Sequence, residues 1–259
     1  GYVPYPCGCV AFRNDRVRLF VLQRAPYVTS STHDPLLHTP PRHRQLDAPG
    51  GRVVIDSFSP FILEGSKPGA AAAALWLAVK TVPLTARGHG LIVKQSLLAA
   101  RELYEWLNRW DALTAGQRSA RFVTLSAEQP DTNIVCFVVK KKDSASLAPM
   151  NRLTEMVYED FTILTELGER EYSYSQAFFL SHTRFQAPQY PVESLAAFFA
   201  RCGLDAGAAD EYAREGLVLL RACVMNPYLH AAREVPGGDY IRSLVEELDR
   251  SAERHAARL

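Results

Sequence analysis

The chain has 259 residues, of which 47% are hydrophobic and 22% are charged, an ordinary composition for a soluble globular protein. Its formal net charge of +1 argues against nucleic acid or an acidic membrane surface as a partner. The five cysteines are odd in number and mostly far apart, which favours a reduced, cytosolic protein over a disulfide scaffold. The longest apolar run, residues 69–79, is too short to cross a bilayer.

The first 60 residues are predicted to form a short hairpin followed by a long loop. Apolar runs at 10–12 and 17–22 flank a polar turn, which is a hairpin pattern. Residues 25–60 then carry six prolines and two glycines, and a loop of that length is usually functional or mobile. The chain opens on the apolar segment Gly1-Tyr2-Val3-Pro4-Tyr5 without a polar lead-in, so we expect the sequence to begin inside a larger protein.

From residue 68 onward strands and helices alternate, which predicts an α/β or α+β fold. The first helix, 68–80, is expected to have Ser66 as its N-cap and Pro68 in its first turn. A domain boundary is placed near residue 90. The later elements are predicted, in chain order, as a helix at 91–110, a strand at 133–139, a helix at 147–161, a strand at 178–183, a helix at 195–202, a strand at 217–225 and a final helix capped by Asp239.

A glycine–serine pair marks the start of the first helix. The backbone N–H groups at Gly65 and Ser66, the serine hydroxyl and the positive end of the helix dipole suit a phosphate group. The alternative is a capped core helix without a ligand. Gly65 and Ser66 are therefore candidate phosphate-binding residues.

Five further side chains are candidates for chemistry. Tyr5 and Tyr27 can donate protons or hydrogen bonds from a cleft, although most tyrosines are structural. Ser181 and His182 are neighbours on a predicted strand, so they point to opposite faces and cannot act together as nucleophile and base. Arg221 lies in an apolar strand, where a guanidinium needs an anionic partner. That partner is either a substrate carboxylate, held bidentately, or a structural Asp or Glu.

No metal site is predicted. Cys7-Gly8-Cys9 has the wrong spacing for a zinc knuckle and lacks a second pair. His33, His38 and His43 lie in the proline-rich loop, where a solvated loop is the better interpretation.

Four segments in order along the chain resemble the group II decarboxylases that depend on pyridoxal phosphate (PLP), and most closely the bacterial tyrosine decarboxylases. The segments are GYVPY at 1–5, ILEGSKPGA at 62–70, FLSHT at 179–183 and LRACVMNPY at 220–228. The resemblance implies an α/β chain of PLP-dependent transferase fold type I. Residues 1–90 would then be the end of the large PLP-binding domain with a mobile active-site loop, and residues 91–259 a linking helix and the C-terminal small α+β domain.

The resemblance also implies residue roles around the cofactor. Tyr27 matches the tyrosine of a mobile loop that protonates the substrate carbon after CO2 leaves, and Tyr5 matches a second active-site tyrosine. Gly65 and Ser66 match a segment that reaches the cofactor phosphate across a dimer interface. In that family an Asp-x-His-Lys segment directly precedes the one matched by residues 1–5, and no residue of this chain occupies the position of its PLP-binding lysine. We expect either a truncated or cleaved protein or, preferably, a lysine modified by its cofactor.

The remaining implied roles concern the substrate. Ser181 and His182 match a strand that lines the substrate pocket, and Arg221 matches a small-domain arginine that contacts the α-carboxylate. The implied activity is PLP-dependent decarboxylation of an aromatic, tyrosine-like L-amino acid, with PLP as the electron sink, in a cytoplasmic homodimer whose active site lies at the interface. The alternatives are a glutamate or aspartate decarboxylase, a C–C lyase of the sphingosine-phosphate lyase type, and a partner subunit without activity.

Overall fold

The computed structural model of the chain describes Arg13 and residues 69–162 and 177–259, and the chain divides into two units after Leu84. In the first unit, helix α2 (Ala70–Thr81) has Gly69 in the N-cap position and no side-chain cap. The helix thus begins at Ala70 rather than at residue 68, and the predicted cap Ser66 and the predicted first-turn residue Pro68 lie outside the described residues.

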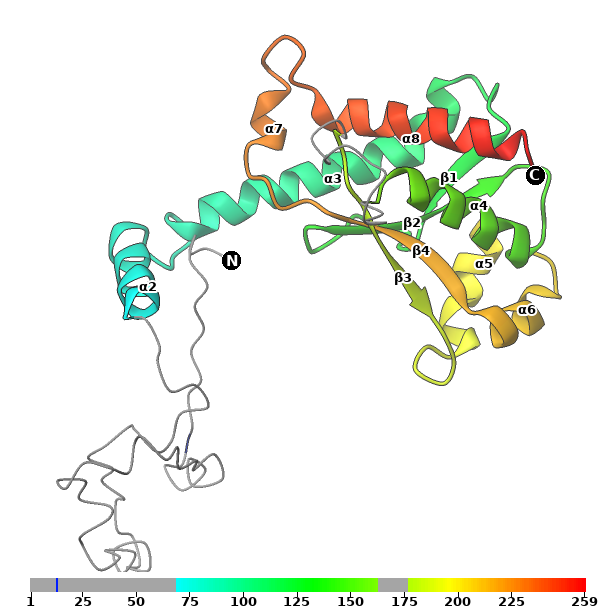
Figure 1. The fold of residues 1–259 in the computed structure, drawn as a ribbon, viewed down its shortest axis with the longest axis horizontal. Coiled ribbons are helices and arrows are strands. Elements are labelled where there is room, and N and C mark those ends of the chain that lie inside the picture. The colour runs from blue at the N-terminus through cyan, green and yellow to red at the C-terminus, as the bar shows by residue number, and fades with distance from the viewer. Residues whose placement is uncertain (1–12, 14–68, 163–176) are drawn as a thin grey trace, which may run out of the picture. The chain divides into compact units, whose positions relative to one another are not determined.

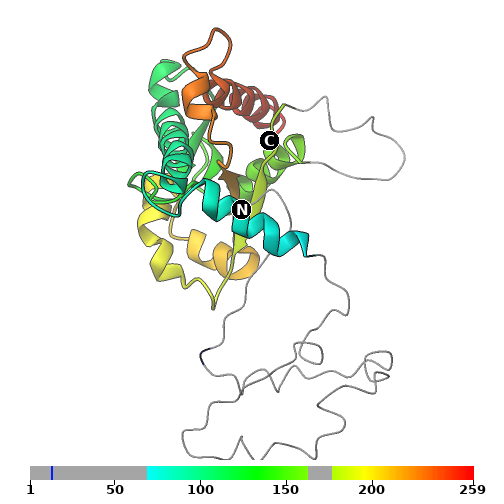
Figure 2. The same ribbon diagram turned by 90° about the vertical axis from the view of Figure 1, so that its left-hand side faces the viewer.

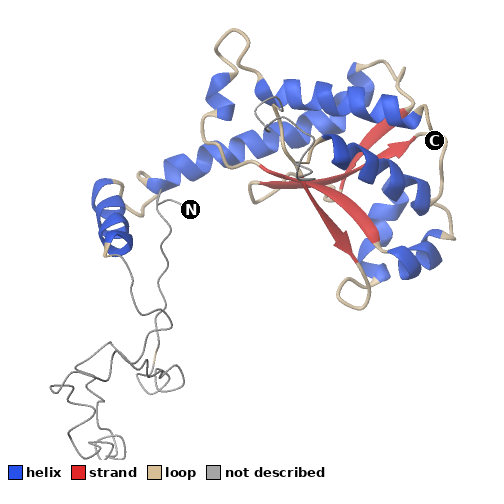
Figure 3. Ribbon diagram, in the orientation of Figure 1, coloured by secondary structure: helices blue, strands red, loops and turns tan. Residues whose placement is uncertain are grey.

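A four-stranded antiparallel sheet organises the second unit (Figure 3). Its strands lie in the order β1, β2, β4, β3. The prediction of a mixed α/β chain is confirmed, while β1 was not predicted and β3 begins later than expected. The strand bounds are Ala120–Thr124 for β1, Ile134–Lys141 for β2, Ser181–Phe185 for β3 and Leu217–Cys223 for β4.

Helices cover both faces of this sheet, as the two orthogonal views show (Figures 1 and 2). Helices α3 and α8 pack on one face, while the 3-10 helix η5 and helices α5 and α6 pack on the other. Each face thus has its own hydrophobic core, the first beneath α3 and α8 and the second beneath η5, α5 and α6. Along β4 the side chains alternate between them, with Leu220 and Ala222 in the first core and Leu217 and Leu219 in the second. The bounds are His89–Leu113 for α3, Val192–Leu195 for η5, Ala196–Cys202 for α5, Ala208–Glu215 for α6, Leu229–Ala232 for α7 and Tyr240–Ala256 for α8.

The predicted cap of the last helix is confirmed. The carboxylate of Asp239 accepts a hydrogen bond from the backbone N–H of Arg242 at 3.0 Å. This bond satisfies one of the N–H groups that a helix start leaves without a partner. None of the helices in the described ranges combines the length and apolarity that crossing a bilayer requires.

Helix α4 (Leu147–Asp160) fills an opening between β2 and β4. These two strands pair only along Ile134–Phe137 and Leu220–Cys223, and beyond that stretch each strand contacts α4 instead. Side chains on the first half of α4 reach the second core, and side chains on its second half reach the first core. The helix thus ties the two cores together.

Two buried polar side chains of α4 replace the missing ladder bonds between these strands. Thr154 accepts a hydrogen bond from the N–H of Val139 at 3.1 Å and donates to the carbonyl of the same residue at 3.2 Å. Asn151 accepts from the N–H of Val218 at 2.9 Å and donates to the carbonyl of Gly216 at 2.9 Å. Both side chains satisfy backbone groups that would otherwise be buried without partners.

The turn from α6 into β4 requires a glycine. Gly216 has φ of 73°, a left-handed conformation that side chains with a Cβ rarely adopt. A Cβ at this position would also lie 2.5 Å from the carbonyl oxygen of Phe185. Any larger residue would therefore push β3 away from the start of β4.

The start of α4 is capped by a residue from α6. The Glu211 carboxylate accepts hydrogen bonds from the Ser146 hydroxyl at 2.7 Å and from the backbone N–H groups of Leu147 at 2.6 Å and Ala148 at 3.0 Å. Desolvation raises the pKa of Glu211, but these bonds and the charge of Arg214 outweigh it, so the pKa lies below its ordinary value. The carboxylate also complements the positive end of the α4 dipole.

Replacing Glu211 by glutamine is expected to lower the free energy of unfolding by about 1 kcal/mol at pH 7, because solvent screens this partly exposed carboxylate. A depressed folded-state pKa stabilises the protein above the unfolded-state pKa, near 4.3, and this contribution disappears as the pH falls through the folded-state value. Urea unfolding of wild type and Glu211→Gln should therefore differ at pH 7 and converge in acid. The exposed Glu128→Gln is the control, and a difference that persists unchanged in acid would contradict this account.

Candidate functional site

Arg221 lies on the face of the sheet that η5, α5 and α6 cover, at the point where these helices no longer cover β4. On that face of β4, Leu217 and Leu219 have no exposed surface, whereas Arg221 and Cys223, further along the same strand, are partly exposed. The guanidinium therefore belongs to an open part of the sheet rather than to the core beneath α5.

The structure brings Ser181 and Arg221 together. They are register partners on β3 and β4, so their side chains share one face. The Ser181 hydroxyl donates a hydrogen bond to the backbone carbonyl of Arg221 at 3.0 Å. Its hydrogen is thus engaged in fixing the two strands, and only its oxygen lone pairs can accept a further bond.

No carboxylate in residues 69–162 or 177–259 forms an ion pair with Arg221. Of the two partners that the sequence left open, the structural Asp or Glu is thus not found in these ranges. A guanidinium carries five N–H donors in a planar fork that matches a carboxylate. A half-buried arginine of this kind is able to bind an anion from outside the described residues.

His182 lies on the opposite face of β3, as the alternation of the strand predicts. Its ring packs against Tyr158 of α4, with ring centroids 4.2 Å apart and an interplanar angle of 54°. Ser181 and His182 therefore do not face one shared pocket on the sheet.

Cys136 and Cys223 are neighbours of Arg221 that sequence reasoning did not select. Cys136 is the register partner of Arg221 on β2, and Cys223 follows two residues later on β4. Because residues two apart on a strand share a face, the sequence alone already places Cys223 on the same face as Arg221. The position of Cys136 opposite Arg221 follows only from the register of β2 and β4. Burial raises the pKa of the Cys136 thiol more than the charge of Arg221 lowers it, so this thiol is a poor nucleophile at neutral pH.

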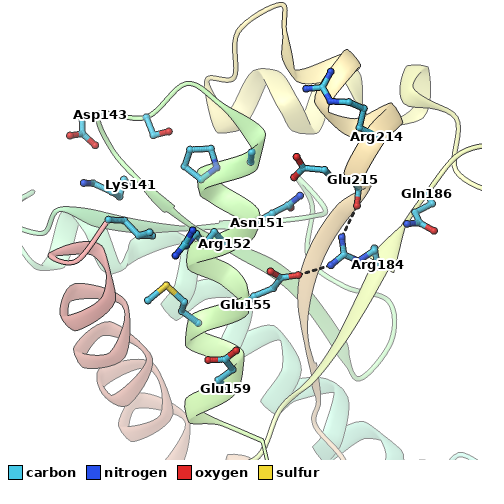
Figure 4. A pocket seen from close by; sticks show the side chains of 15 residues that line it. Lys141, Asp143, Asn151, Arg152, Glu155, Glu159, Arg184, Gln186, Arg214 and Glu215 are labelled. Carbon is cyan, nitrogen blue, oxygen red and sulfur yellow. Dashed lines mark hydrogen bonds and ion pairs between the residues drawn. The ribbon is translucent and has the colours of Figure 1, made fainter.

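A separate cleft of about 1210 Å³ lies between α4, β3 and α6 (Figure 4). Arg184 crosses it, donating to the Glu155 carboxylate and to the backbone carbonyl of Glu215. Charged side chains of both signs line the rest, including Arg152 and Glu159, which form no ion pair with the other described residues. Because these charges nearly balance, the cleft does not favour one class of ligand, and Arg221 does not line it.

The described residues do not by themselves form a PLP site. Lys140 is their deeply buried lysine, with 2% of its surface exposed. Its ammonium donates to the carbonyls of Lys141 and Ser144, and burial, followed by the nearby charge of Arg121, lowers its pKa. These bonds engage the ammonium of Lys140 and give it a structural role rather than that of a cofactor ligand. The described ranges also contain no cluster of three or more metal-ligating side chains.

Four of the predicted site residues lie outside the described residues. They are Tyr5, Tyr27, Gly65 and Ser66. Their roles stay predictions.

Comparison with known proteins assigns the family. A family model described as "Tyrosine decarboxylase, C-terminal" matches residues 99–248, which is more than half of the chain. The chain belongs to this tyrosine decarboxylase family. The part of this chain that the family model matches contains all four strands, and it therefore includes Ser181, Arg221 and both neighbouring cysteines.

Individual relatives of this chain are named L-tyrosine decarboxylase. The L-tyrosine decarboxylase of Enterococcus faecium is 31% identical over 234 residues, covering 90% of this chain and 33% of the relative. The L-tyrosine decarboxylase of Levilactobacillus brevis is 31% identical over 231 residues, covering 89% of this chain and 32% of the relative. The chain thus spans about a third of the length of these relatives of the tyrosine decarboxylase family.

Proposed function

We propose that this chain is part of a PLP-dependent carboxy-lyase that converts an aromatic L-amino acid, tyrosine first, to its amine and CO2. Family membership and the names of the relatives support the reaction. The observation that carries the proposal is Arg221, a half-buried arginine without a carboxylate partner among the described residues. It lies inside the region that the family model matches.

In this proposal Arg221 holds the α-carboxylate of the substrate. A guanidinium and a carboxylate form two parallel charge-assisted hydrogen bonds, which fix orientation as well as position. The bond from Ser181 to the carbonyl of Arg221 holds β3 against β4 at this point. Ser181 therefore supports the strand position from which the guanidinium extends.

The other parts of the proposal rest on the resemblance. PLP, bound in a transferase of fold type I, supplies the electron sink for decarboxylation. Tyr27 and Tyr5 act as proton donors, and Gly65 and Ser66 contact the cofactor phosphate. The resemblance also implies a pocket-lining role for His182, but this residue lies on the face of β3 opposite Arg221 and is not part of the carboxylate site proposed here. Residues 1–90 belong to the large domain, and residues 91–259 form the linking helix and the C-terminal small domain, of a cytoplasmic homodimer.

The test is a panel of L-amino acids given to the whole protein loaded with PLP, scored for CO2, amine and aldehyde. We expect L-tyrosine to have the highest kcat/KM and to yield tyramine and CO2 in equal amounts. D-tyrosine and the protein without PLP are the controls. Release of CO2 from glutamate or aspartate but not from tyrosine would refute the aromatic assignment, and release of an aldehyde without CO2 would refute decarboxylation.

A further inference from the structure

Two cysteines border Arg221 on the open part of the sheet. Cys136 lies directly opposite Arg221 on β2, and Cys223 lies two residues beyond it on β4. Opposed residues of an antiparallel pair have Cβ atoms about 4.5–5.5 Å apart, and residues two apart on a strand share a face. Both thiols are free and partly exposed, whereas the third described cysteine, Cys202, is buried.

We propose that Cys136 and Cys223 form two walls of the carboxylate-binding site at Arg221. A carboxylate bound to the guanidinium then shields both thiols from solvent, and a group attached to either thiol closes the site. This inference rests on the proposed role of Arg221. It adds that the two thiols can be modified when the site is empty and are protected when a carboxylate is bound.

Neutral thiols suit such walls. Because burial keeps the pKa of Cys136 above its ordinary value, the side chain stays protonated at neutral pH and does not neutralise Arg221. A thiol is only a weak hydrogen-bond partner, so it leaves the N–H groups of the guanidinium to the ligand. A carboxylate side chain at either position would instead pair with Arg221 and occupy the site.

Iodoacetamide labelling probes this arrangement. The thiolate sulfur attacks the methylene carbon of the reagent, the new S–C bond forms as the C–I bond breaks, iodide leaves and the thiol proton passes to the buffer. The product is a bulky neutral side chain. No oxidant or reductant is needed.

The experiment labels the whole PLP-loaded protein at about pH 8.5, where thiolate forms more readily, and measures each cysteine by peptide mass spectrometry. The ligand is 3-(4-hydroxyphenyl)propionate, and its neutral amide is the matched control. At ten times its dissociation constant, measured by titrating the protection itself, the carboxylate is expected to slow labelling of Cys136 and Cys223 by about tenfold. The amide is expected to have little effect, and Arg221→Gln should abolish the protection. Cys202 should stay unlabelled throughout.

Two variants of Cys136 test its place beside the carboxylate-binding site without labelling. Cys136→Asp places a carboxylate opposite Arg221 and is expected to raise the KM for L-tyrosine by at least about tenfold. The matched neutral variant Cys136→Asn should have a much smaller effect. Equal effects of Asp and Asn would count against the inference.

The outcomes separate this inference from the proposed function. If tyrosine is decarboxylated but the carboxylate and the amide protect the thiols equally, or not at all, the inference is wrong and the function stands. If the carboxylate alone protects the thiols through Arg221 but no CO2 is released, the thiol-walled anion site stands and the function is wrong. Labelling of Cys202 as fast as the other two would also overturn the inference, because exposure of this face would not then explain reactivity.

Discussion

Replacing Arg221 by glutamine is expected to raise the KM for L-tyrosine roughly 10- to 150-fold, which corresponds to the loss of a charge-assisted hydrogen bond worth about 1.5–3 kcal/mol. The kcat should change by less than about threefold. The reason is that the carboxylate loses its charge as CO2 leaves, so a guanidinium that binds it stabilises the bound substrate at least as well as the transition state. Steady-state kinetics with the PLP-loaded protein measure both constants.

Two further variants make this result specific. Arg221→Lys keeps the charge but loses the planar fork, so an intermediate KM is expected. Arg152→Gln removes an exposed arginine of the cleft beside α4 and should leave KM unchanged. A fall in kcat at constant KM in Arg221→Gln would show that Arg221 acts on the transition state or only on the fold.

Replacing Asn151 by alanine is expected to lower the free energy of unfolding by about 3 kcal/mol. Asn151 is 4% exposed, and its amide satisfies the N–H of Val218 and the carbonyl of Gly216. Each buried backbone group left without a partner costs about 1–3 kcal/mol. Thr154→Val, which removes one hydroxyl of similar function, should cost about 1–2 kcal/mol.

Chemical denaturation of each variant measures these losses. The control is Glu159→Ala, on the exposed side of the same helix α4, where a loss of about 0.5 kcal/mol is expected. A loss for Asn151→Ala no larger than this control would mean that α4 does not substitute for the strand ladder between β2 and β4.

The elements with a strong periodic pattern could be predicted from the sequence. The apolar run predicted as a strand at 217–225 indicated β4, and the placement of Asp239 before an amphipathic pattern indicated α8. The short strand β1 was missed because its five residues form a strand through pairing with β2, which no local pattern reveals. The limits of β3 were shifted because its pairing with β4, and not its apolar content, determines where it begins.

The polar residues inside α4 show a second limit of sequence reasoning. Asn151 and Thr154 in the middle of a helix resemble solvent-facing positions. They are buried because β2 and β4 separate, and this separation is a tertiary feature. Sequence could not indicate that a helix would satisfy the edges of two strands.

For the candidate site, the sequence identified Arg221 and its need for an anion. It also placed Ser181 and His182 on opposite faces, as observed. It did not identify Cys136, because the partner of Arg221 across β2 depends on a register between segments that are far apart in the chain. A local sequence pattern can thus identify a residue that carries chemistry, whereas identifying its neighbours in space requires knowledge of how the strands pair.

If Arg221 binds the carboxylate of the substrate, the protein must distinguish a carboxylate inhibitor from its neutral amide. The decisive measurement is the inhibition of L-tyrosine decarboxylation by 3-(4-hydroxyphenyl)propionate and by its amide, in wild type and in Arg221→Gln. We predict that wild type prefers the carboxylate by roughly 10- to 150-fold and that this preference disappears in the variant. An unchanged preference for the carboxylate in Arg221→Gln would contradict the account.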